Sequence, residues 1–212
     1  MTMVWFDFGG VLSPPIQTLF DIYESRTGVS RAQMEAAMAD IAAPLGVHPL
    51  APIELAMMPQ REWGAAMRAS LARLYPDLDT SQCEFETHGD QWFGDVPANP
   101  EMIGLFHEVK GRRIKAGILT NNVVEWEVPW RAMVGLDDYT DAIVDSCKVG
   151  ARKPEPRIFE IAAAAGGADP RDNILIDDVR ENCIAATECG WQAILFEDNE
   201  QVRRDLRSLL AR

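Results

Sequence analysis

The 212-residue sequence has few cysteines, few lysines and no long hydrophobic run. Its four cysteines form no CxxC pair, which argues against a zinc site or a disulfide framework and predicts reduced thiols in a cytoplasmic protein. No apolar run approaches the roughly 20 residues that cross a bilayer, so no membrane association is expected. The N-terminus enters the apolar segment 3–6 without a basic lead or a cleavage site, and we therefore expect no signal peptide.

The chain also has fewer basic than acidic residues. Lys and Arg number 20 against 33 Asp and Glu, which gives a net charge of −13. Nucleic acids and anionic membranes bind clustered cations, so neither is expected as a partner, whereas a small anionic ligand at a local site remains compatible. Apolar residues make up 47% of the chain, enough for the core of one domain or of a domain with an insertion. A monomer and a homodimer are both allowed.

The first half of the chain is predicted to be almost entirely helical. A short apolar strand over 3–8 delivers Asp7 into a glycine loop. From there to about residue 96 the apolar spacing is helical and no strand pattern is convincing. The predicted helices are 16–27, 31–43 and 63–74, and the proline-rich stretch 46–59 is expected to be a loop.

Predicted strands and helices alternate after residue 99, which indicates βαβ units and a parallel sheet. Right-handed crossovers place the carboxyl ends of such strands at one edge, where these sheets bind ligands. Asp7, Thr120 and the pair Asp177 and Asp178 should therefore converge, with the helical stretch above them as a lid. The predicted strands are 114–119, 142–144, 173–176 and 192–196, and the predicted helices are about 100–110, 155–165, 181–189 and 202–210.

Acidic residues at two strand ends are candidates for chemistry. Asp7 at a strand end can act as a nucleophile, and Gly9 and Gly10 let backbone amides approach a bound anion. Asp177 and Asp178 would bring further negative charge to the same place, which is unfavourable unless a cation intervenes. Carboxylate ligands with room for water suit Mg²⁺. The alternative is that Asp7 only caps a turn and that the acidic pair forms an exposed turn.

Lys153 and Thr120 are candidates for binding an anion. Lys153 is one of four lysines and precedes Pro154, which can open a helix, so its ammonium would reach the same edge. There it would neutralise a nucleophile and phosphate oxygens. Thr120 would donate its hydroxyl to a phosphate oxygen. The alternatives are a solvated surface lysine and a threonine that caps a strand end.

Taken together, these segments resemble the four motifs of the haloacid dehalogenase superfamily. The order and spacing of the motifs cover residues 3 to about 197, and the stretch 141–159 is similar to the N-terminal phosphatase domain of soluble epoxide hydrolase. The matching segments are Asp7–Leu12 for the first motif, Thr120–Asn121 for the second, Lys153 within Val149–Pro156 for the third, and Asp177–Asn182, in the form DDxxxN, for the fourth.

The resemblance implies an α/β fold with a Rossmann-like parallel sheet core and a small all-helical cap inserted after the first strand. Residues 1–13 and 97–212 would form the core, and residues 14–96 would form the cap. In this architecture the cap determines specificity, and no segment of it carries a readable substrate code.

The resemblance also implies a Mg²⁺-dependent phosphatase that hydrolyses a small phosphorylated metabolite through an aspartyl-phosphate intermediate. Asp7 would be the nucleophile and Lys153 the second catalytic residue. The other implied roles are metal binding by the Asp7 carboxylate, the Gly9 carbonyl and Asp178, phosphoryl binding by Thr120, Asn121 and Gly10, and support of the site by Asp177 and Asn182.

Gly9 departs from the phosphatase pattern, because phosphatases of this family usually carry there a second Asp that protonates the leaving group. Loss of such an acid/base costs about 10²–10⁴ in rate. His48, Glu54 and His88 of the predicted cap are the candidates to replace it. Two alternatives remain: a metal-independent hydrolase like the 2-haloacid dehalogenases, which also lack the second Asp, and a catalytically weak regulatory or binding protein.

Overall fold

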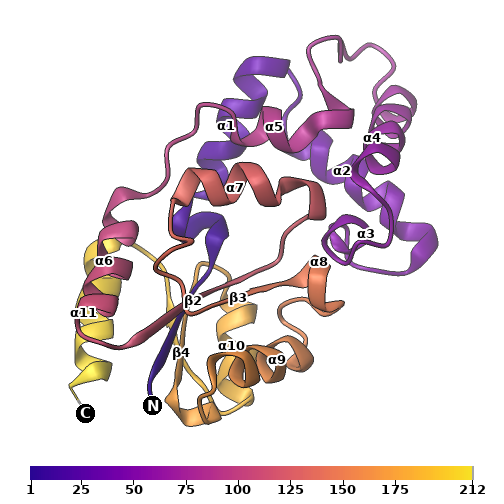
Figure 1. Ribbon diagram of the computed structural model, residues 1–212. Helices are drawn as coiled ribbons and strands as arrows, with labels where there is room; N and C mark the ends of the chain where they lie inside the picture. Colours follow the sequence, from indigo (N-terminus) through magenta and orange to yellow (C-terminus); the bar gives the residue numbers. More distant parts are fainter. Residues whose placement is uncertain (212) are drawn as a thin grey trace.

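A parallel sheet of five strands in the order β3-β2-β1-β4-β5 organises the chain (Figure 1). The computed structural model describes residues 1–211; Arg212, the last residue of the predicted core, lies outside the described residues. The predicted α/β fold with a Rossmann-like sheet is confirmed. The strands are β1 (Met3–Phe6), β2 (Lys115–Thr120), β3 (Ala142–Asp145), β4 (Asn173–Asp177) and β5 (Gln192–Leu195).

Helices connect and follow the strands. Where a helix range was predicted, its ends agree with the structure to within a few residues, as for the last helix, predicted over 202–210 and found as α11. The helices are α1 (Ile16–Thr27), α2 (Arg31–Ala42), α3 (Ala51–Glu54), α4 (Gln60–Leu74), α5 (His88–Phe93), α6 (Pro100–Gly111), α7 (Glu127–Val134), α8 (Ser146–Val149), α9 (Pro156–Gly166), α10 (Arg180–Glu188) and α11 (Asn199–Leu210).

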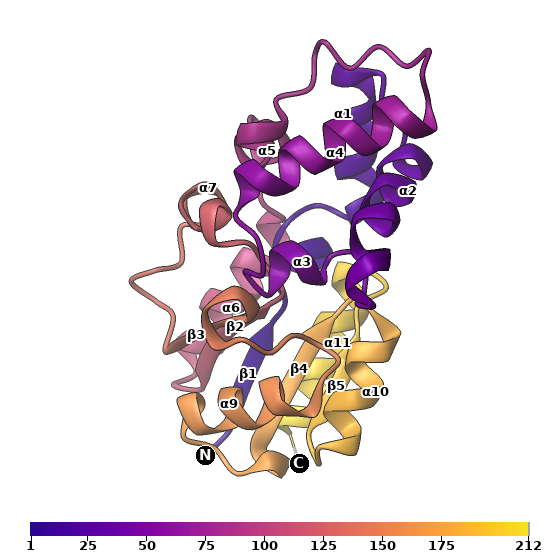
Figure 2. The ribbon, with the colours of Figure 1, turned by 90° about the vertical axis from the view of Figure 1, so that its right-hand side faces the viewer.

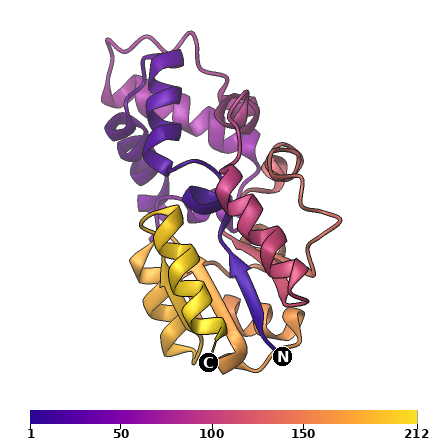
Figure 3. The same cartoon turned by 90° about the vertical axis from the view of Figure 1, so that its left-hand side faces the viewer.

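Helices cover both faces of the sheet, and alternate side chains of β1 point into the two opposite helical layers. Phe6 packs against Phe106 of α6, in the layer that α6 and α11 form on one face (Figure 3). Trp5 stacks with Trp191 in the layer of α9 and α10 on the other face (Figure 2). This double burial explains why β1 consists entirely of apolar residues.

Helices α1 to α5 lie between β1 and β2 in the chain and stand beyond the carboxyl ends of the strands (Figure 1). Residues 14–96, all of which the structure describes, contain no strand. The predicted loop over 46–59 is wrong in part, because Pro52 lies in the first turn of α3, where a missing N–H is tolerated. Phe8, after β1, contacts Phe93 of α5 and Trp130 of α7, and so joins the sheet core to the helical segment.

Within residues 1–211, no helix is both long enough and apolar enough to cross a membrane. All four cysteines are free thiols, and two of them, Cys83 and Cys183, are buried.

The tightest backbone approach in the helical segment is at Gly64 of α4, where an added Cβ would lie 2.2 Å from the carbonyl oxygen of Phe85. Replacing Gly64 with Ala should therefore destabilise the protein by about 1–3 kcal/mol, although Ala is the better helix former. Gly111 at the end of α6 has no atom within 4 Å of an added Cβ, so Gly111→Ala should be neutral or stabilising. Urea unfolding measures both, and wild-type stability of Gly64→Ala would contradict this packing.

Candidate active site

Asp7 follows β1 at the carboxyl edge of the sheet. Its backbone N–H donates to the Ile176 carbonyl of β4 at 2.9 Å, and its Oδ1 accepts from the Phe8 N–H at 2.7 Å. Gly10 follows with φ of +71°, and an added Cβ there would lie 2.2 Å from Oδ2 of Asp178. Glycine is thus required at this position both for its backbone angle and for the close approach of Asp178.

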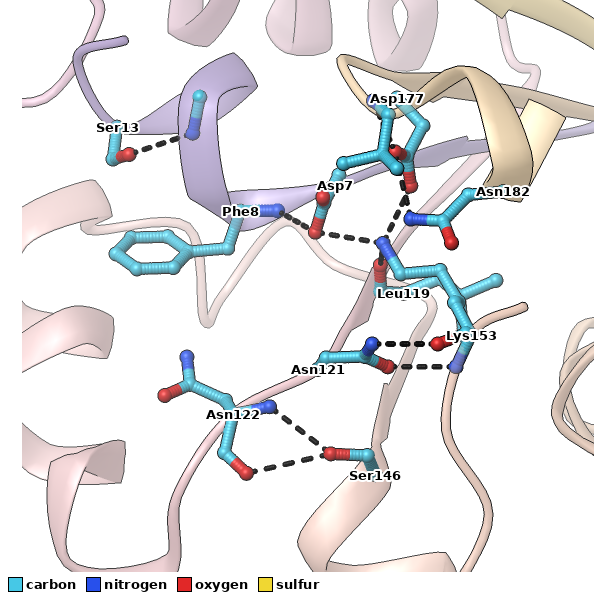
Figure 4. Close-up of polar contacts among 12 residues, drawn as sticks. Asp7, Phe8, Ser13, Leu119, Asn121, Asn122, Ser146, Lys153, Asp177 and Asn182 are labelled. Carbon is cyan, nitrogen blue, oxygen red and sulfur yellow. Dashed lines mark hydrogen bonds and ion pairs between the residues drawn. The ribbon is translucent and has the colours of Figure 1, made fainter. Parts of the chain in front are cut away.

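Lys153 is the most deeply buried cation of the site, with a residue exposure of 1%. Its Nζ lies 2.9 Å from Oδ1 of Asp7 and 2.6 Å from Oδ2 of Asp177, and it donates to the Leu119 carbonyl at 2.9 Å (Figure 4). Three oxygens thus fix the ammonium between the strand ends. The alternative of a solvated surface lysine is therefore wrong.

Asp177 and Asn121 hold Lys153 from two sides. Oδ1 of Asp177 accepts from the Asn182 side chain at 3.0 Å and from the Val179 N–H at 2.9 Å, which leaves Oδ2 for Lys153. The Asn121 amide donates to the Lys153 carbonyl at 2.9 Å and accepts from the Lys153 N–H at 2.8 Å (Figure 4). The contacts of Asp177 fix the Lys153 side chain, and those of Asn121 fix its backbone.

The predicted convergence of the strand ends is observed. Asp7, Asp177 and Asp178 each offer an oxygen, and these oxygens lie within 4.8 Å of one another. Thr120 is buried at the end of β2, the strand beside β1. Two buried carboxyl groups, one partly buried carboxyl group and one buried ammonium therefore lie close together, so that acidic groups outnumber basic ones.

This crowding appears in the pKa values. Burial raises the pKa of Asp7 well above its usual range, and the neighbouring Asp177 and Asp178 carboxylates add to the effect against the opposing influence of Lys153. Burial and Asp177 raise the pKa of Asp178 to about 6. Burial alone would lower the pKa of Lys153, but Asp177 and Asp7 outweigh it and raise that pKa. Lys153 therefore stays protonated. Its single positive charge does not balance the three acidic groups beside it, so a further positive charge would be favourable there.

A cavity of about 1150 Å³ opens from these residues toward the helical segment. Asp7, Lys153 and Asp178 line one part of it, while α1, α2, α3, α4 and α5 contribute a mostly apolar wall. His48 and His88 both line the cavity; His48 is exposed, and His88 is encased by aromatic rings.

Arg152 is a cavity residue that sequence reasoning missed. It is 8% exposed, and its Nε and Nη2 lie 2.8 and 2.7 Å from Oε2 of Glu54, which is equally buried. The two residues are 98 positions apart, and Glu54 lies in the stretch predicted as a loop. The one sequence feature that could have placed Arg152 near the site is its position directly before Lys153.

Removing the Lys153 charge should destabilise the protein in a pH-dependent way. Lys153→Met leaves three carboxylates without their cation, which should cost about 3–5 kcal/mol at pH 7. Without Lys153 the folded-state pKa values of these carboxyls rise further above their unfolded values, so the loss should shrink as pH falls and they become protonated. Urea unfolding at pH 7 and pH 5 measures this effect.

Lys148→Met is the matched control, because the Lys148 side chain is 50% exposed and its pairing with Glu127 lies at the surface. It should change stability little at either pH. Equal losses for the two variants, or a Lys153→Met loss that grows toward acid pH, would contradict the buried charge cluster.

Comparison with known proteins agrees with this geometry. A family model described as haloacid dehalogenase-like hydrolase matches residues 1–190. A phosphatase of Mycobacterium tuberculosis is 32% identical over 117 residues, which are 52% of this chain and 53% of the relative. Bifunctional epoxide hydrolase 2 of Rattus norvegicus is 27% identical over 52% of this chain and 21% of its own length, which confirms the predicted similarity. The matched part thus spans about half of the first relative and a fifth of the second.

Solved structures share the fold at low sequence identity. A HAD family enzyme of Bacteroides thetaiotaomicron, in complex with magnesium and inorganic phosphate, superposes with a TM-score of 0.61 at 17% identity, covering 92% of this chain and 93% of the other. L-2-haloacid dehalogenase of Xanthobacter autotrophicus, with chloropropionic acid covalently bound, gives 0.66 at 17% identity, covering 98% and 83%. The family match, together with the strand-end acids around a buried lysine, shows that this chain belongs to the haloacid dehalogenase-like hydrolases.

Proposed function

We propose that this hydrolase is a Mg²⁺-dependent phosphatase acting on a small phosphorylated metabolite through an aspartyl-phosphate on Asp7. The observation that carries the proposal is the clustering of Asp7, Asp177 and Asp178 around the single ammonium of Lys153. Such an excess of buried carboxylates calls for a divalent cation. Attack of an aspartate on carbon needs no such cation.

The oxygens present suit Mg²⁺. The Asp7 and Asp178 carboxylates and the Gly9 carbonyl would hold the ion, and the absence of a side chain at Gly10 leaves room for the Asp178 carboxylate. Bound there, Mg²⁺ would offset the repulsion between the anionic nucleophile and an anionic phosphate. The bound magnesium and phosphate of the structurally similar Bacteroides thetaiotaomicron enzyme support this assignment.

The residues of this chain divide the chemistry among them. Asp7 attacks phosphorus and the bond from phosphorus to the leaving-group oxygen breaks; water then attacks phosphorus and releases phosphate from Asp7. Lys153 neutralises charge on Asp7 and on the phosphoryl oxygens. Thr120, Asn121 and Gly10 bind or border the phosphoryl group. Asp177 and Asn182 keep the ammonium of Lys153 in place.

Residues 14–96 act in this proposal as a cap over a core formed by residues 1–13 and 97–212. The cavity between them is large enough for a phosphorylated metabolite, and its cap side is lined by side chains such as Leu19, Phe20 and Trp63. The organic part of the substrate would contact this wall, so the cap would select the substrate.

A 2-haloacid dehalogenase-like activity is another candidate, and Gly9 is compatible with it because those enzymes also lack the second acid. The fold similarity to the Xanthobacter autotrophicus dehalogenase is compatible with it. A catalytically weak regulatory or binding protein is the third candidate. The two experiments below separate all three.

Magnesium should stabilise the folded protein through Asp178. Binding to the folded state at 100 times its dissociation constant adds about 2.7 kcal/mol, so millimolar Mg²⁺ should raise the melting temperature measured after chelation of trace metal. Asp178→Asn should abolish most of the shift. Glu181→Gln, which removes a cavity-lining carboxyl on the neighbouring helix α10, should keep it. An unchanged wild-type melting temperature with Mg²⁺ would argue against a magnesium site.

Asp7→Asn should abolish turnover while keeping the fold, because the amide has the size of the carboxyl but is no nucleophile. The assay is phosphate release from a panel of phosphorylated metabolites with and without Mg²⁺, and wild-type activity should require the metal. Metal-independent chloride release from 2-chloropropionate would instead favour the dehalogenase. Ligand binding without turnover across the panel would favour the regulatory protein.

A further inference from the structure

We propose that Glu54 is the acid/base that replaces the second aspartate missing at Gly9. The inference rests on the proposed phosphatase function and adds a catalytic residue to it. Phosphate ester hydrolysis needs a proton for the leaving-group oxygen and a base for the attacking water, and Gly9 supplies neither. An added Cβ at Gly9 would meet only Ile16 Cδ1, at 4.0 Å, so space remains beside the nucleophile for a group that comes from elsewhere.

Glu54 lies in the wall of the same cavity as Asp7 and Lys153. The Ser146 hydroxyl donates to the Glu54 carbonyl at 2.7 Å and accepts from the Asn122 N–H at 3.0 Å. These bonds tie the end of α3 to the loop after β2, whose residue Asn121 holds the Lys153 backbone. The helical segment therefore presents Glu54 at a fixed position over the sheet edge.

Arg152 orients the Glu54 carboxylate and leaves one of its oxygens available. Both contacts of the guanidinium, from Nε at 2.8 Å and from Nη2 at 2.7 Å, fall on Oε2. Among residues 1–211, no hydrogen bond reaches Oε1, whereas Oε2 accepts from Arg152. Arg152 directly precedes Lys153, whose ammonium contacts Asp7, and Glu54 lines the same cavity as these three residues.

Burial acts on Glu54 and on the two histidines in opposite directions. It raises the pKa of Glu54, although Arg152 and Lys153 lower it, and so favours a carboxyl that carries a proton. Burial lowers the pKa of His88 to about 4, and burial together with Arg152 lowers that of His48. Burial thus works against a protonated imidazole at either histidine and toward a protonated carboxyl at Glu54.

The proton balance is complete with Glu54 alone. In the first step Asp7 bonds to phosphorus, the ester bond to the leaving oxygen breaks, and that oxygen takes a proton from Oε1 of protonated Glu54, while Oε2 keeps its contacts with Arg152. In the second step water attacks phosphorus and the bond between phosphorus and Asp7 breaks. The water proton returns to the Glu54 carboxylate, so the protein ends as it began.

The test compares two leaving groups in the full-length protein with Mg²⁺. Glu54→Gln keeps the size of the side chain and an acceptor for Arg152 but carries no acidic proton. It should lower kcat/KM about 10²-fold or more for the best alkyl phosphate of the metabolite panel. It should lower kcat/KM less than about tenfold for p-nitrophenyl phosphate, whose leaving group needs no proton. Adding Gly9→Asp should restore much of the alkyl phosphate activity.

Glu62→Gln is the matched control, because Glu62 of α4 belongs to the same helical segment but is exposed and is not among the residues that line the cavity. It should change neither rate. Equal losses on both substrates, unchanged rates, or a double variant no faster than Glu54→Gln would each overturn the assignment of Glu54. A wild-type protein that hydrolyses neither ester with Mg²⁺ would instead contradict the phosphatase function itself.

Discussion

The buried ammonium of Lys153 is the contact on which the rest of the site depends. It lies between Asp7 and Asp177 and is held by oxygens from β2, from β4 and from the residue that follows β1. A charge so deeply buried is stable only when it is paired and hydrogen-bonded, and here each partner is itself fixed by a further bond. Asn182 and the Val179 N–H fix Asp177, and the Phe8 N–H fixes Asp7. The lysine therefore gives three strand ends a common geometry.

The same contact explains why the site needs more positive charge than the chain provides. Three carboxylates meet one ammonium in a buried volume, and the pKa values of Asp7 and Asp178 rise in consequence. Carboxyl groups with strongly raised pKa values cost folding stability at neutral pH and are common at functional sites. In the proposed function a divalent cation would offset this repulsion, and a phosphate would then meet positive charge from both the cation and Lys153.

The sequence predicted the sheet and the strand-end residues because both follow from local patterns. The apolar runs of β1 and β4 and the topology of parallel sheets bring Asp7 and Asp177 together without knowledge of any side-chain contact. The pairing of Glu54 with Arg152 was beyond reach, because it joins residues 98 positions apart and depends on how the helical segment packs against the sheet. The short helix α3 was missed for a related reason, since four residues are too few to show a helical period.

The central claim is that Asp7 carries the phosphoryl group during turnover. The most direct measurement is a rapid acid quench of the protein with a substrate ester and Mg²⁺, followed by mass spectrometry of the proteolytic peptides. The account predicts one added phosphoryl group on the peptide that contains Asp7, absent when Mg²⁺ is removed and absent in Asp7→Asn. Steady phosphate release with an unmodified Asp7 peptide, or with the phosphoryl group on another residue, would contradict it.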